Sequence, residues 1–360
     1  MSANDTKAEE RAKAVVFEDV NIVFGEKPAL ALPLMDAGKS RAEIQEETGQ
    51  VLGVHACSLE VSEGEIIVLM GLSGSGKSTL LRAVNGLNPV VRGQVLVNDG
   101  GALVNVTGAD AKTLRQIRLH RVAMVFQQFG LLPWRDVLEN VAFGLELAGE
   151  PRKQREEKAR KQLDLVGLSD WESRKVSELS GGMQQRVGLS RAFATEAPIL
   201  LMDEPFSALD PLIRNRLQDE LLELQRNLKR TIIFVSHDLD EAFKIGDRIA
   251  IMEGGRIVQC GTPPEIIRNP ANDYVADFVA HMNPLGVLRA MDVMIEGEAP
   301  VDAPEIHADT KLQDVMEPLK EGRVLNVMSE DGAHLGVIRP AEIVSALTPR
   351  ERPAETADTV

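Results

Sequence analysis

The sequence predicts an α/β fold with a parallel sheet that is interrupted by a helical insertion. An apolar strand, a glycine-rich loop and a helix follow one another at residues 66–87, which is the order of an α/β unit. Strand-like runs return at PILLMD and TIIFVS, and a polar helix separates them. The chain between about 133 and 197 shows helical spacing without strand-like runs, so it predicts a helical insertion within the α/β core.

Short β-rich runs flank this core. VVFEDVNIVF begins at Val15 and VHACSLEVSEGEIIVLMG begins at Val54, with a polar, helix-like insert at 33–53 between them. Further along the chain, RIAIMEGGRIVQCG predicts two strands about a Gly-Gly turn. The N-terminal runs therefore predict a small β subdomain beside the parallel sheet.

The chain changes character after Pro270, where it becomes acidic and is punctuated by prolines. Residues 311–347 have the pattern helix, strand, strand, helix, and the tail TPRERPAETADTV lacks the apolar residues that a core needs. These features divide the chain into four parts. We expect a disordered N-terminus at 1–12, a main α/β domain at 13–280, a small C-terminal α/β unit at 281–348 and a disordered tail at 349–360.

Composition and charge restrict the classes of function. Forty basic and fifty-five acidic side chains give a formal net charge of −15, which argues against a nucleic-acid partner. No run approaches the roughly 20 apolar residues of a membrane-spanning helix, and the polar start MSANDTKAEERAKA is unlike a signal peptide. We therefore expect a cytoplasmic chain. Cys57 and Cys260 stand singly, so neither a disulfide framework nor a zinc site is indicated.

A phosphate-binding loop is the first chemical motif. GLSGSGKS matches G-x-x-x-x-G-K-[ST] and stands between a strand and a helix. Its glycines let the backbone curl so that successive N–H groups face an anion. Lys77 brings a cation to the β- and γ-phosphates, and the Ser78 hydroxyl can coordinate Mg²⁺; the alternative is a glycine-rich turn that binds no nucleotide. The predicted nucleotide-binding residues of this loop are Gly71, Ser73, Gly74, Ser75, Gly76, Lys77, Ser78 and Thr79.

A second motif, ILLMDEP, has four apolar residues that lead into two acids. This is expected of a buried parallel strand whose carboxyl end opens onto a ligand. Asp203 would hold Mg²⁺ through its water shell, and Glu204 would act as the general base for the attacking water. The alternative is an acidic strand end that only meets solvent.

A third motif, LSGGMQQR, separates this chain from other nucleotide enzymes. It places Ser180, Gly181 and Gly182 at the amino end of a helix, where a serine can cap and exposed amides can meet an anion. One nucleotide cannot readily occupy both anion sites of one chain if the helical insertion holds them apart. Two chains packed head to tail would bring each LSGGM to the phosphate loop of the other.

Together these motifs resemble the ATP-binding cassette (ABC) family. By that resemblance, GLSGSGKST is the Walker A loop, LSGGM the signature, ILLMDEP the Walker B strand, and SALD, which ends at Asp210, the loop that links two active sites. The resemblance implies a P-loop NTPase core with an antiparallel β subdomain and the helical insertion. It also implies that ATP and Mg²⁺ are the ligands.

The same resemblance gives roles to three residues outside these motifs. Gln127 in VFQQFGLLP matches the glutamine that contacts Mg²⁺ and the attacking water, with Gln128 as the weaker candidate. His237 in FVSHD matches the histidine that contacts the γ-phosphate in the closed dimer. Phe24 in NIVFG is the best match to the aromatic residue that stacks on adenine, and Phe17 remains an alternative.

Several details resemble one branch of the family, the importers of glycine betaine, choline and related quaternary ammonium solutes. They are the insert before the second strand, the run IIVLMGLSGSGKSTLLRAVNGL, and methionine at position 183. Within this branch the similarity is greatest to bacterial choline-uptake ATPases. Two Trp and one Tyr cannot build the aromatic cage that binds a quaternary ammonium. Specificity is therefore expected in a separate permease and substrate-binding protein.

The resemblance implies a homodimer that acts on an integral membrane permease at the cytoplasmic face of the bacterial inner membrane. The part at 281–348 resembles one cystathionine-β-synthase-type unit, which is either regulatory or a degenerate remnant. Two alternatives stay open: an ABC ATPase that acts on nucleic acid or ribosomes without transport, and one that imports a different small solute. The single cassette and the charge of −15 weigh against the first.

Overall fold

The computed structural model describes residues 11–280, 282–298, 300, 302–319 and 323–347. The chain forms two compact units, Met1–Cys260 and Gly261–Val360. This division falls earlier in the chain than the boundary at 280/281 expected from the sequence. The segments expected to be disordered, 1–12 and 349–360, lie outside the described residues except for residues 11 and 12.

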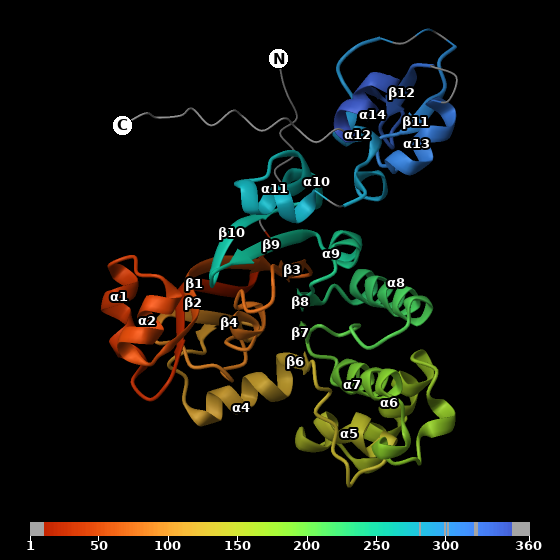
Figure 1. Cartoon of the computed structure of the whole chain (residues 1–360). Coiled ribbons are helices and arrows are strands. Elements are labelled where there is room, and N and C mark those ends of the chain that lie inside the picture. The colour runs from red at the N-terminus through yellow and green to blue at the C-terminus, as the bar shows by residue number, and fades with distance from the viewer. Residues whose placement is uncertain (1–10, 281, 299, 301, 320–322, 348–360) are drawn as a thin grey trace. The chain divides into compact units, whose positions relative to one another are not determined.

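The centre of the first unit is a six-stranded sheet in the order β10-β9-β3-β8-β7-β6 (Figure 1). The four neighbouring pairs from β9 to β6 are parallel. Every residue of β3, β7 and β8 is buried, as expected of strands covered on both faces. The predicted parallel α/β core is confirmed. Its strands are β3 (Ile66–Met70), β6 (Val122–Val125), β7 (Ile199–Asp203), β8 (Thr231–Val235), β9 (Arg248–Glu253) and β10 (Arg256–Gly261).

A four-stranded sheet in the order β2-β1-β4-β5 forms the antiparallel β subdomain that the sequence predicts. The pairing of β1 with β2 shifts register at several places, among them between Phe17 and Val20, and such shifts bend a strand. Phe17 is buried in a core shared with Ile67 and Leu69 of the parallel sheet. The two sheets are therefore parts of one folded body. The strands are β1 (Lys13–Phe24), β2 (Val51–Ser62), β4 (Arg92–Asn98) and β5 (Leu103–Asn105).

The helix-like insert between β1 and β2 folds into the 3-10 helix η1 (Pro28–Ala31) and the helices α1 (Leu32–Asp36) and α2 (Arg41–Thr48). A capping box of Ser40 and Glu43 begins α2, because each side chain satisfies a free backbone N–H of the other residue. Met35 and Ile44 are buried with apolar residues of β1 and β2. This small core fixes the insert against the antiparallel sheet (Figure 1).

The helical insertion forms as predicted. Helix α5 packs against both α6 and α7 (Figure 1). Asp136 caps α5 in a capping box with Glu139, and the fully buried Asn140 accepts a hydrogen bond from the Leu132 N–H at 2.8 Å. This bond attaches the entering loop to the insertion. The elements are α5 (Val137–Leu147), α6 (Arg152–Leu165), the 3-10 helices η2 (Ser169–Trp171) and η3 (Val176–Glu178), and α7 (Gly181–Ala194).

The remaining helices of the first unit are α3 (Lys77–Leu81), α4 (Ala111–His120), α8 (Pro211–Leu228) and α9 (Leu239–Ile245). The helix after the phosphate loop is shorter than the sequence predicts. Beyond Leu81 the chain continues in turns, and Asn85 and Gly86 (φ 65°) favour turns over a helix interior. Among the described residues no helix is both long and apolar enough to cross a membrane.

The second unit has its own sheet and core. The sheet has the order β11-β12-β13, with β11 parallel and β13 antiparallel to β12. Apolar side chains of its strands and helices, such as Leu312, Leu325 and Ile338, form one buried cluster. The pattern helix, strand, strand, helix predicted at 311–347 is present. The elements are α10 (Pro263–Arg268), α11 (Asp273–Val279), η4 (Pro284–Gly286), α12 (Ala290–Val293), β11 (Glu305–His307), α13 (Leu312–Leu319), β12 (Leu325–Met328), β13 (His334–Ile338) and α14 (Pro340–Leu347).

Leu201→Ala tests the parallel core, because Leu201 of β7 is fully buried there. We expect the free energy of unfolding to fall by about 2–5 kcal/mol, since the lost side chain leaves a cavity that the neighbours fill only in part. Urea denaturation of the full chain, followed through the unfolding of the first unit, measures this change in free energy. Leu228→Ala, at a site that is 53% exposed, is the control and should cost less than about 0.5 kcal/mol; equal losses in both variants would contradict the described core.

Candidate active site

A cavity of about 710 Å³ lies where the phosphate loop, β2, and the residues after β7 and β8 meet. Parallel strands β3, β7 and β8 all end at this edge of the sheet, so the residues that follow them come together. The cavity has the size of a ligand site. The predicted site residues that line it are Phe24, Ser73, Gly74, Gly76, Lys77, Ser78, Thr79, Gln127, Glu204 and His237.

The phosphate loop depends on glycine at two positions. Gly71 has φ 137°, and a Cβ there would lie 2.1 Å from the carbonyl oxygen of Met252. Gly76 has φ 101°, and its Cβ would lie 2.7 Å from the carbonyl oxygen of Gly53. Any other residue would be strained and would clash with the backbone. The loop therefore packs tightly on β2 and on the end of β9.

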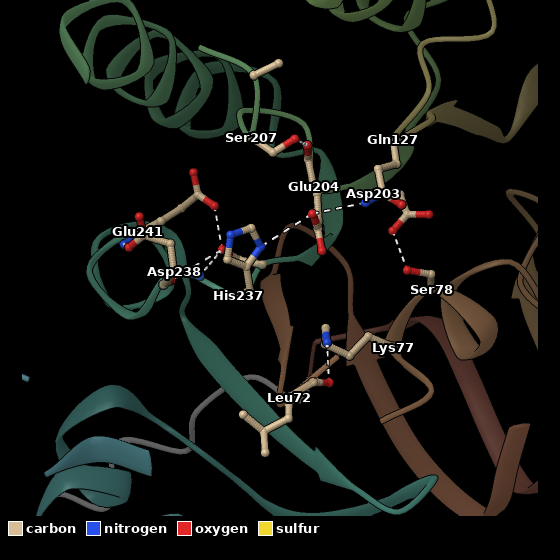
Figure 2. A network of polar contacts seen from close by, with 12 residues as sticks. Leu72, Lys77, Ser78, Gln127, Asp203, Glu204, Ser207, His237, Asp238 and Glu241 are labelled. Atoms are coloured by element: carbon tan, nitrogen blue, oxygen red, sulfur yellow. Dashed lines mark hydrogen bonds and ion pairs between the residues drawn. The ribbon is translucent and has the colours of Figure 1, made fainter. Parts of the chain in front are cut away.

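Lys77 is buried in the loop, and its Nζ donates hydrogen bonds to the carbonyls of Gly71 at 2.8 Å and Leu72 at 3.0 Å (Figure 2). Burial lowers the pKa of the Lys77 ammonium, while the carboxylates of Glu204 and Asp203 act in the opposite direction. Lys77 makes no ion pair with a described residue. Its charge is therefore available to an anion in the cavity.

Asp203, the last residue of β7, is fully buried behind the loop. Its Oδ1 accepts a hydrogen bond from the Ser78 hydroxyl at 2.6 Å, and its Oδ2 pairs with the Arg82 guanidinium at 2.8 Å. Both carboxylate oxygens are thus satisfied, as a buried charge requires. Arg82 was not predicted from the sequence, because nothing in STLLRAVNGL distinguishes it from a surface arginine.

Glu204 lies between two predicted residues. Its Oε2 accepts a hydrogen bond from Gln127 Nε2 at 3.2 Å and lies 3.4 Å from Nδ1 of His237 (Figure 2). Gln128 does not line the cavity. Glu204 has φ 49°, a left-handed conformation that is uncommon for a residue other than glycine. Two features therefore direct its side chain away from β7: the left-handed turn of the backbone and the alternation of side chains along an extended chain.

The left-handed turn at Glu204 is held by neighbouring residues. The Glu204 N–H donates to the carbonyl of Val235 at 3.1 Å, and its own carbonyl accepts from Ser207 Oγ at 3.1 Å and from Gln185 Nε2 at 3.4 Å. Gln185, which is 1% exposed, also accepts from the N–H of Ala208 at 3.2 Å. Gln185 belongs to α7, so the helix after LSGGM is connected to the loop that follows β7. This role of Gln185 was missed because it depends on a contact between distant segments.

The structure distinguishes the two candidate aromatic residues. Phe17 is 1% exposed and belongs to the core, whereas Phe24 is 39% exposed and lines the cavity. A Cβ on Gly53 would lie 2.8 Å from Cε2 of Phe24, so the ring lies directly over a glycine of β2. Phe24 remains the candidate for stacking on adenine.

The signature residues lie elsewhere in the chain's own fold. Ser180 caps α7, and its Oγ accepts from the Met183 N–H at 3.4 Å. Asp210 caps α8. Neither these two residues nor Gly181 and Gly182 line the cavity. Their predicted contact with nucleotide is not made in this cavity and stays a prediction.

The insert adds cavity residues that the sequence did not indicate. Arg41 and Gln45, four residues apart on α2, line the cavity together with Val51 and Leu52 at the start of β2. The long insert was the available signal in the sequence. Within it, Arg41 and Gln45 are four residues apart, so they lie on the same face of a helix. The sequence did not show which surface that face would contact.

Known proteins with similar sequences identify the family. Residues 54–207 match the family described as ABC transporter. The glycine betaine/proline betaine transport system ATP-binding protein ProV of Salmonella typhimurium is 53% identical over 271 residues, which cover 75% of this chain and 67% of ProV. The trimethylamine N-oxide transport system ATP-binding protein TmoW of Ruegeria pomeroyi is 42% identical over 322 residues, 86% of this chain and 93% of TmoW.

A solved structure agrees with these relatives. The ATP-binding cassette MJ0796, a dimer in a post-hydrolysis state bound to ADP and Pi, matches with a TM-score of 0.60 at 28% identity. The match covers 69% of this chain and 98% of that chain. The chain belongs to the ABC transporter family. It is an ATP-binding subunit with ATPase activity, and it is similar to the subunits of quaternary amine import systems.

The loop that carries His237 is fixed by Glu241 of α9. The Glu241 carboxylate accepts hydrogen bonds from Ser236 Oγ at 2.5 Å and Gln218 Nε2 at 3.0 Å. The residue is 7% exposed. Burial raises the pKa of Glu241, and the two hydrogen bonds lower it by less.

Glu241→Gln should make stability less dependent on pH. The folded chain disfavours the ionised form of Glu241, so its stability falls as the pH rises above the ordinary carboxyl pKa of 4.5 toward the raised value. The neutral amide removes this loss. Urea midpoints at a series of pH values above about 4.5 measure it. Glu253→Gln, at an exposed position, is the control; a wild-type pH profile in Glu241→Gln would contradict the prediction.

Proposed function

We propose that this chain hydrolyses MgATP in a site shared by two copies of itself and thereby energises import of glycine betaine, choline or a related quaternary ammonium compound. The observation that carries the proposal is the Glu204 carboxylate, which lies between Gln127 and His237 in the wall of the cavity that also holds Lys77. This arrangement combines a general base with groups that position it and a cation for phosphate.

The cavity has suitable groups for each part of ATP. Phe24 offers an exposed aromatic face for adenine, and aromatic rings prefer stacked or edge contacts with other rings. The loop and the first turn of α3 offer backbone N–H groups and Lys77 for the phosphates.

The donor set also fits Mg²⁺. Ser78 gives its hydrogen to Asp203, which leaves lone pairs of its oxygen free for a metal ion. Gln127 adds a hard oxygen donor at the cavity wall, and the Asp203 carboxylate lies behind Ser78. No group of three or more His, Cys, Asp or Glu that could hold a metal exists in the described part of the chain. The set therefore suits an ion that keeps waters and binds substrate phosphates. We assign Ser78, Gln127 and Asp203 to it.

Hydrolysis would depend chiefly on positioning and on charge. Mg²⁺, when bound, neutralises charge that develops on the phosphates. Glu204 would accept a proton from the attacking water, and its 3.2 Å hydrogen bond to Gln127 Nε2 orients the carboxylate. His237, whose side chain is 64% exposed, is free to reach the γ-phosphate. Lys77 would exchange its carbonyl partners for phosphate oxygens.

The second anion site belongs to the partner chain. Ser180, Gly181 and Gly182 begin α7 outside the cavity, and the related cassette MJ0796 is dimeric. Two copies packed head to tail would place these residues against the γ-phosphate of the other copy. Asp210 would lie in the loop that joins the two sites.

Transport requires membrane partners. The relatives' names refer to glycine betaine, proline betaine and trimethylamine N-oxide, which share a quaternary or fully substituted nitrogen. Trp134 and Trp171 lie in the helical insertion with exposed side chains, so they do not form a buried cage for such a cation. A separate permease and a substrate-binding protein would select the solute, and the ATPase dimer would act at the cytoplasmic face of the inner membrane. The C-terminal unit would be regulatory or a remnant.

Glu204→Gln should lower the ATPase rate by about 10²- to 10⁴-fold, because it removes the general base. ATP affinity should stay near the wild-type value, since Glu204 would act on the water and not on the nucleotide. The measurement uses the chain purified with its permease and reconstituted in vesicles together with the substrate-binding protein. ATPase rate, ATP affinity, and uptake of labelled glycine betaine, choline and trimethylamine N-oxide are compared.

Glu157→Gln on the exposed side of α6 is the matched control and should leave all three readouts unchanged. A Glu204→Gln enzyme with a wild-type ATPase rate would remove Glu204 from the proposed role. ATP-dependent uptake of none of these solutes by the wild-type complex would contradict the transport assignment.

Gly181→Asp tests the composite site. A Cβ on Gly181 meets no atom within 4 Å in its own chain, so the substitution should not disturb the fold. A carboxylate at this position would repel the phosphates bound by the partner chain. Combined with Glu204→Gln, whose slow hydrolysis should leave MgATP bound, Gly181→Asp should abolish the MgATP-dependent dimer that Glu204→Gln alone is expected to form, as measured by light scattering. Gly108→Asp, also in open space, is the control; an unchanged dimer in Gly181→Asp would contradict the head-to-tail arrangement.

A further inference from the structure

Arg41, the first residue of α2, bridges two backbone segments of the nucleotide cavity. Its Nη1 donates to the carbonyl of Gly74 in the phosphate loop at 2.9 Å, and its Nη2 donates to the carbonyl of Gly53 in β2 at 2.6 Å. The capping box that begins α2 and the buried Ile44 one turn later fix the start of this helix. The insert thus places the guanidinium of Arg41 in contact with the phosphate loop.

The contact fixes the direction of a peptide group in the loop. In a trans peptide the carbonyl and the following N–H point in opposite directions. Arg41 holds the Gly74 carbonyl, and the N–H of the same peptide, on Ser75, donates to Leu72 at 3.2 Å. The next carbonyl, that of Ser75, accepts from the Gly255 N–H at 3.1 Å. Two successive peptide groups of the loop are therefore held by segments outside it.

No ion pair accounts for the position of Arg41. Among the described residues it has no carboxylate partner, and its buried Nε has no hydrogen-bond partner. Burial alone lowers the pKa of its guanidinium. In contrast, Arg92 pairs with Asp36 at 2.7 Å. A partly buried cation without a counter-ion is unfavourable. The hydrogen bonds to the two backbone carbonyls are therefore the interactions that stabilise Arg41 in this position.

Glycine leaves the space that the guanidinium occupies. A Cβ on Gly255, which has φ 85°, would lie 2.9 Å from Nη2 of Arg41 and 2.9 Å from the carbonyl of Gly53. The turn between β9 and β10 therefore closes over Arg41 only with glycine at this position. Insert, phosphate loop, β2 and this turn meet at one guanidinium.

We propose that Arg41 is a positioning residue of the nucleotide site: its guanidinium holds the phosphate loop in the curled form whose amides receive the phosphates of ATP. The inference rests on the proposed function of this site. Lys77 holds the carbonyls of Gly71 and Leu72 and would leave them for the phosphates. Arg41 keeps its carbonyls, so the loop stays ordered while its own lysine moves.

Arg41→Ala in the full chain, purified with its membrane partner, tests this. We expect the KM for ATP to rise about tenfold, because two charge-assisted hydrogen bonds to the loop are lost, while kcat stays within about twofold. The melting temperature should change by no more than about 2 °C, since the small core of the insert is untouched. Amide hydrogen exchange of the nucleotide-free chain should become faster in the segment 71–78.

Two further variants sharpen the test. Arg41→Lys retains the charge but has one ammonium in place of the guanidinium fork, so its KM should lie between wild type and Arg41→Ala. Lys39→Ala removes an equal charge two residues before Arg41, where Lys39 pairs with Glu47, and should behave as wild type. An unchanged KM in Arg41→Ala, a fall in kcat as large as the rise in KM, or a wild-type KM in Arg41→Lys would overturn the inference.

Failure of the inference is distinguishable from failure of the proposed function. A wild-type complex that is not saturated by ATP, or that shows no ATPase, contradicts the function itself. A wild-type complex with normal ATPase together with an Arg41→Ala variant of unchanged KM contradicts the positioning role alone. If Arg41→Ala does not fold, Arg41→Lys and the exchange rates of 71–78 decide.

Discussion

The parallel pairing of β3, β7 and β8 is the constraint on which the rest of the structure depends. In this register Leu69 of β3 and Asp203 of β7 both lie opposite Val235 of β8. The three strands therefore end together, and the chain leaves each of them into the same space. The phosphate loop, the pair of acids and the loop of His237 are neighbours for this reason. A slip of one residue in either pairing would turn these side chains to the other face.

Buried polar contacts make this arrangement rigid. Asp203 links Ser78 to Arg82, and Gln185 links the helix after the signature to the turn at Glu204. Loss of the partner of a buried polar group would reduce stability by about 1–3 kcal/mol. Each contact therefore strongly favours the one side-chain arrangement in which it is made. Glu204 occupies an uncommon left-handed conformation within this network. Such a conformation persists only where the surroundings impose it.

In the proposed dimer this cavity is one half of the site, and the other half would be built on a second copy. The residues that begin α7 lie outside the cavity of their own chain. The second wall comes from the antiparallel sheet and its insert, which supply Phe24 and Arg41. Under the proposed function, a chain would hold ATP through its own walls and complete the reaction when a second copy binds.

The sequence by itself determined the features whose chemistry is contiguous. The curl of the phosphate loop depends on its own glycines, the acids after β7 on one apolar strand, and the cap at Ser180 on one helix start. Tertiary structure decided which distant residues meet these motifs. It brought Gln127 and His237 next to the Glu204 carboxylate. It buried Phe17 and left Phe24 at the cavity. It also brought Arg41, Arg82 and Gln185 into contact with the site. The physical reason is that such contacts depend on strand register and on how side chains pack around it, and local sequence carries neither.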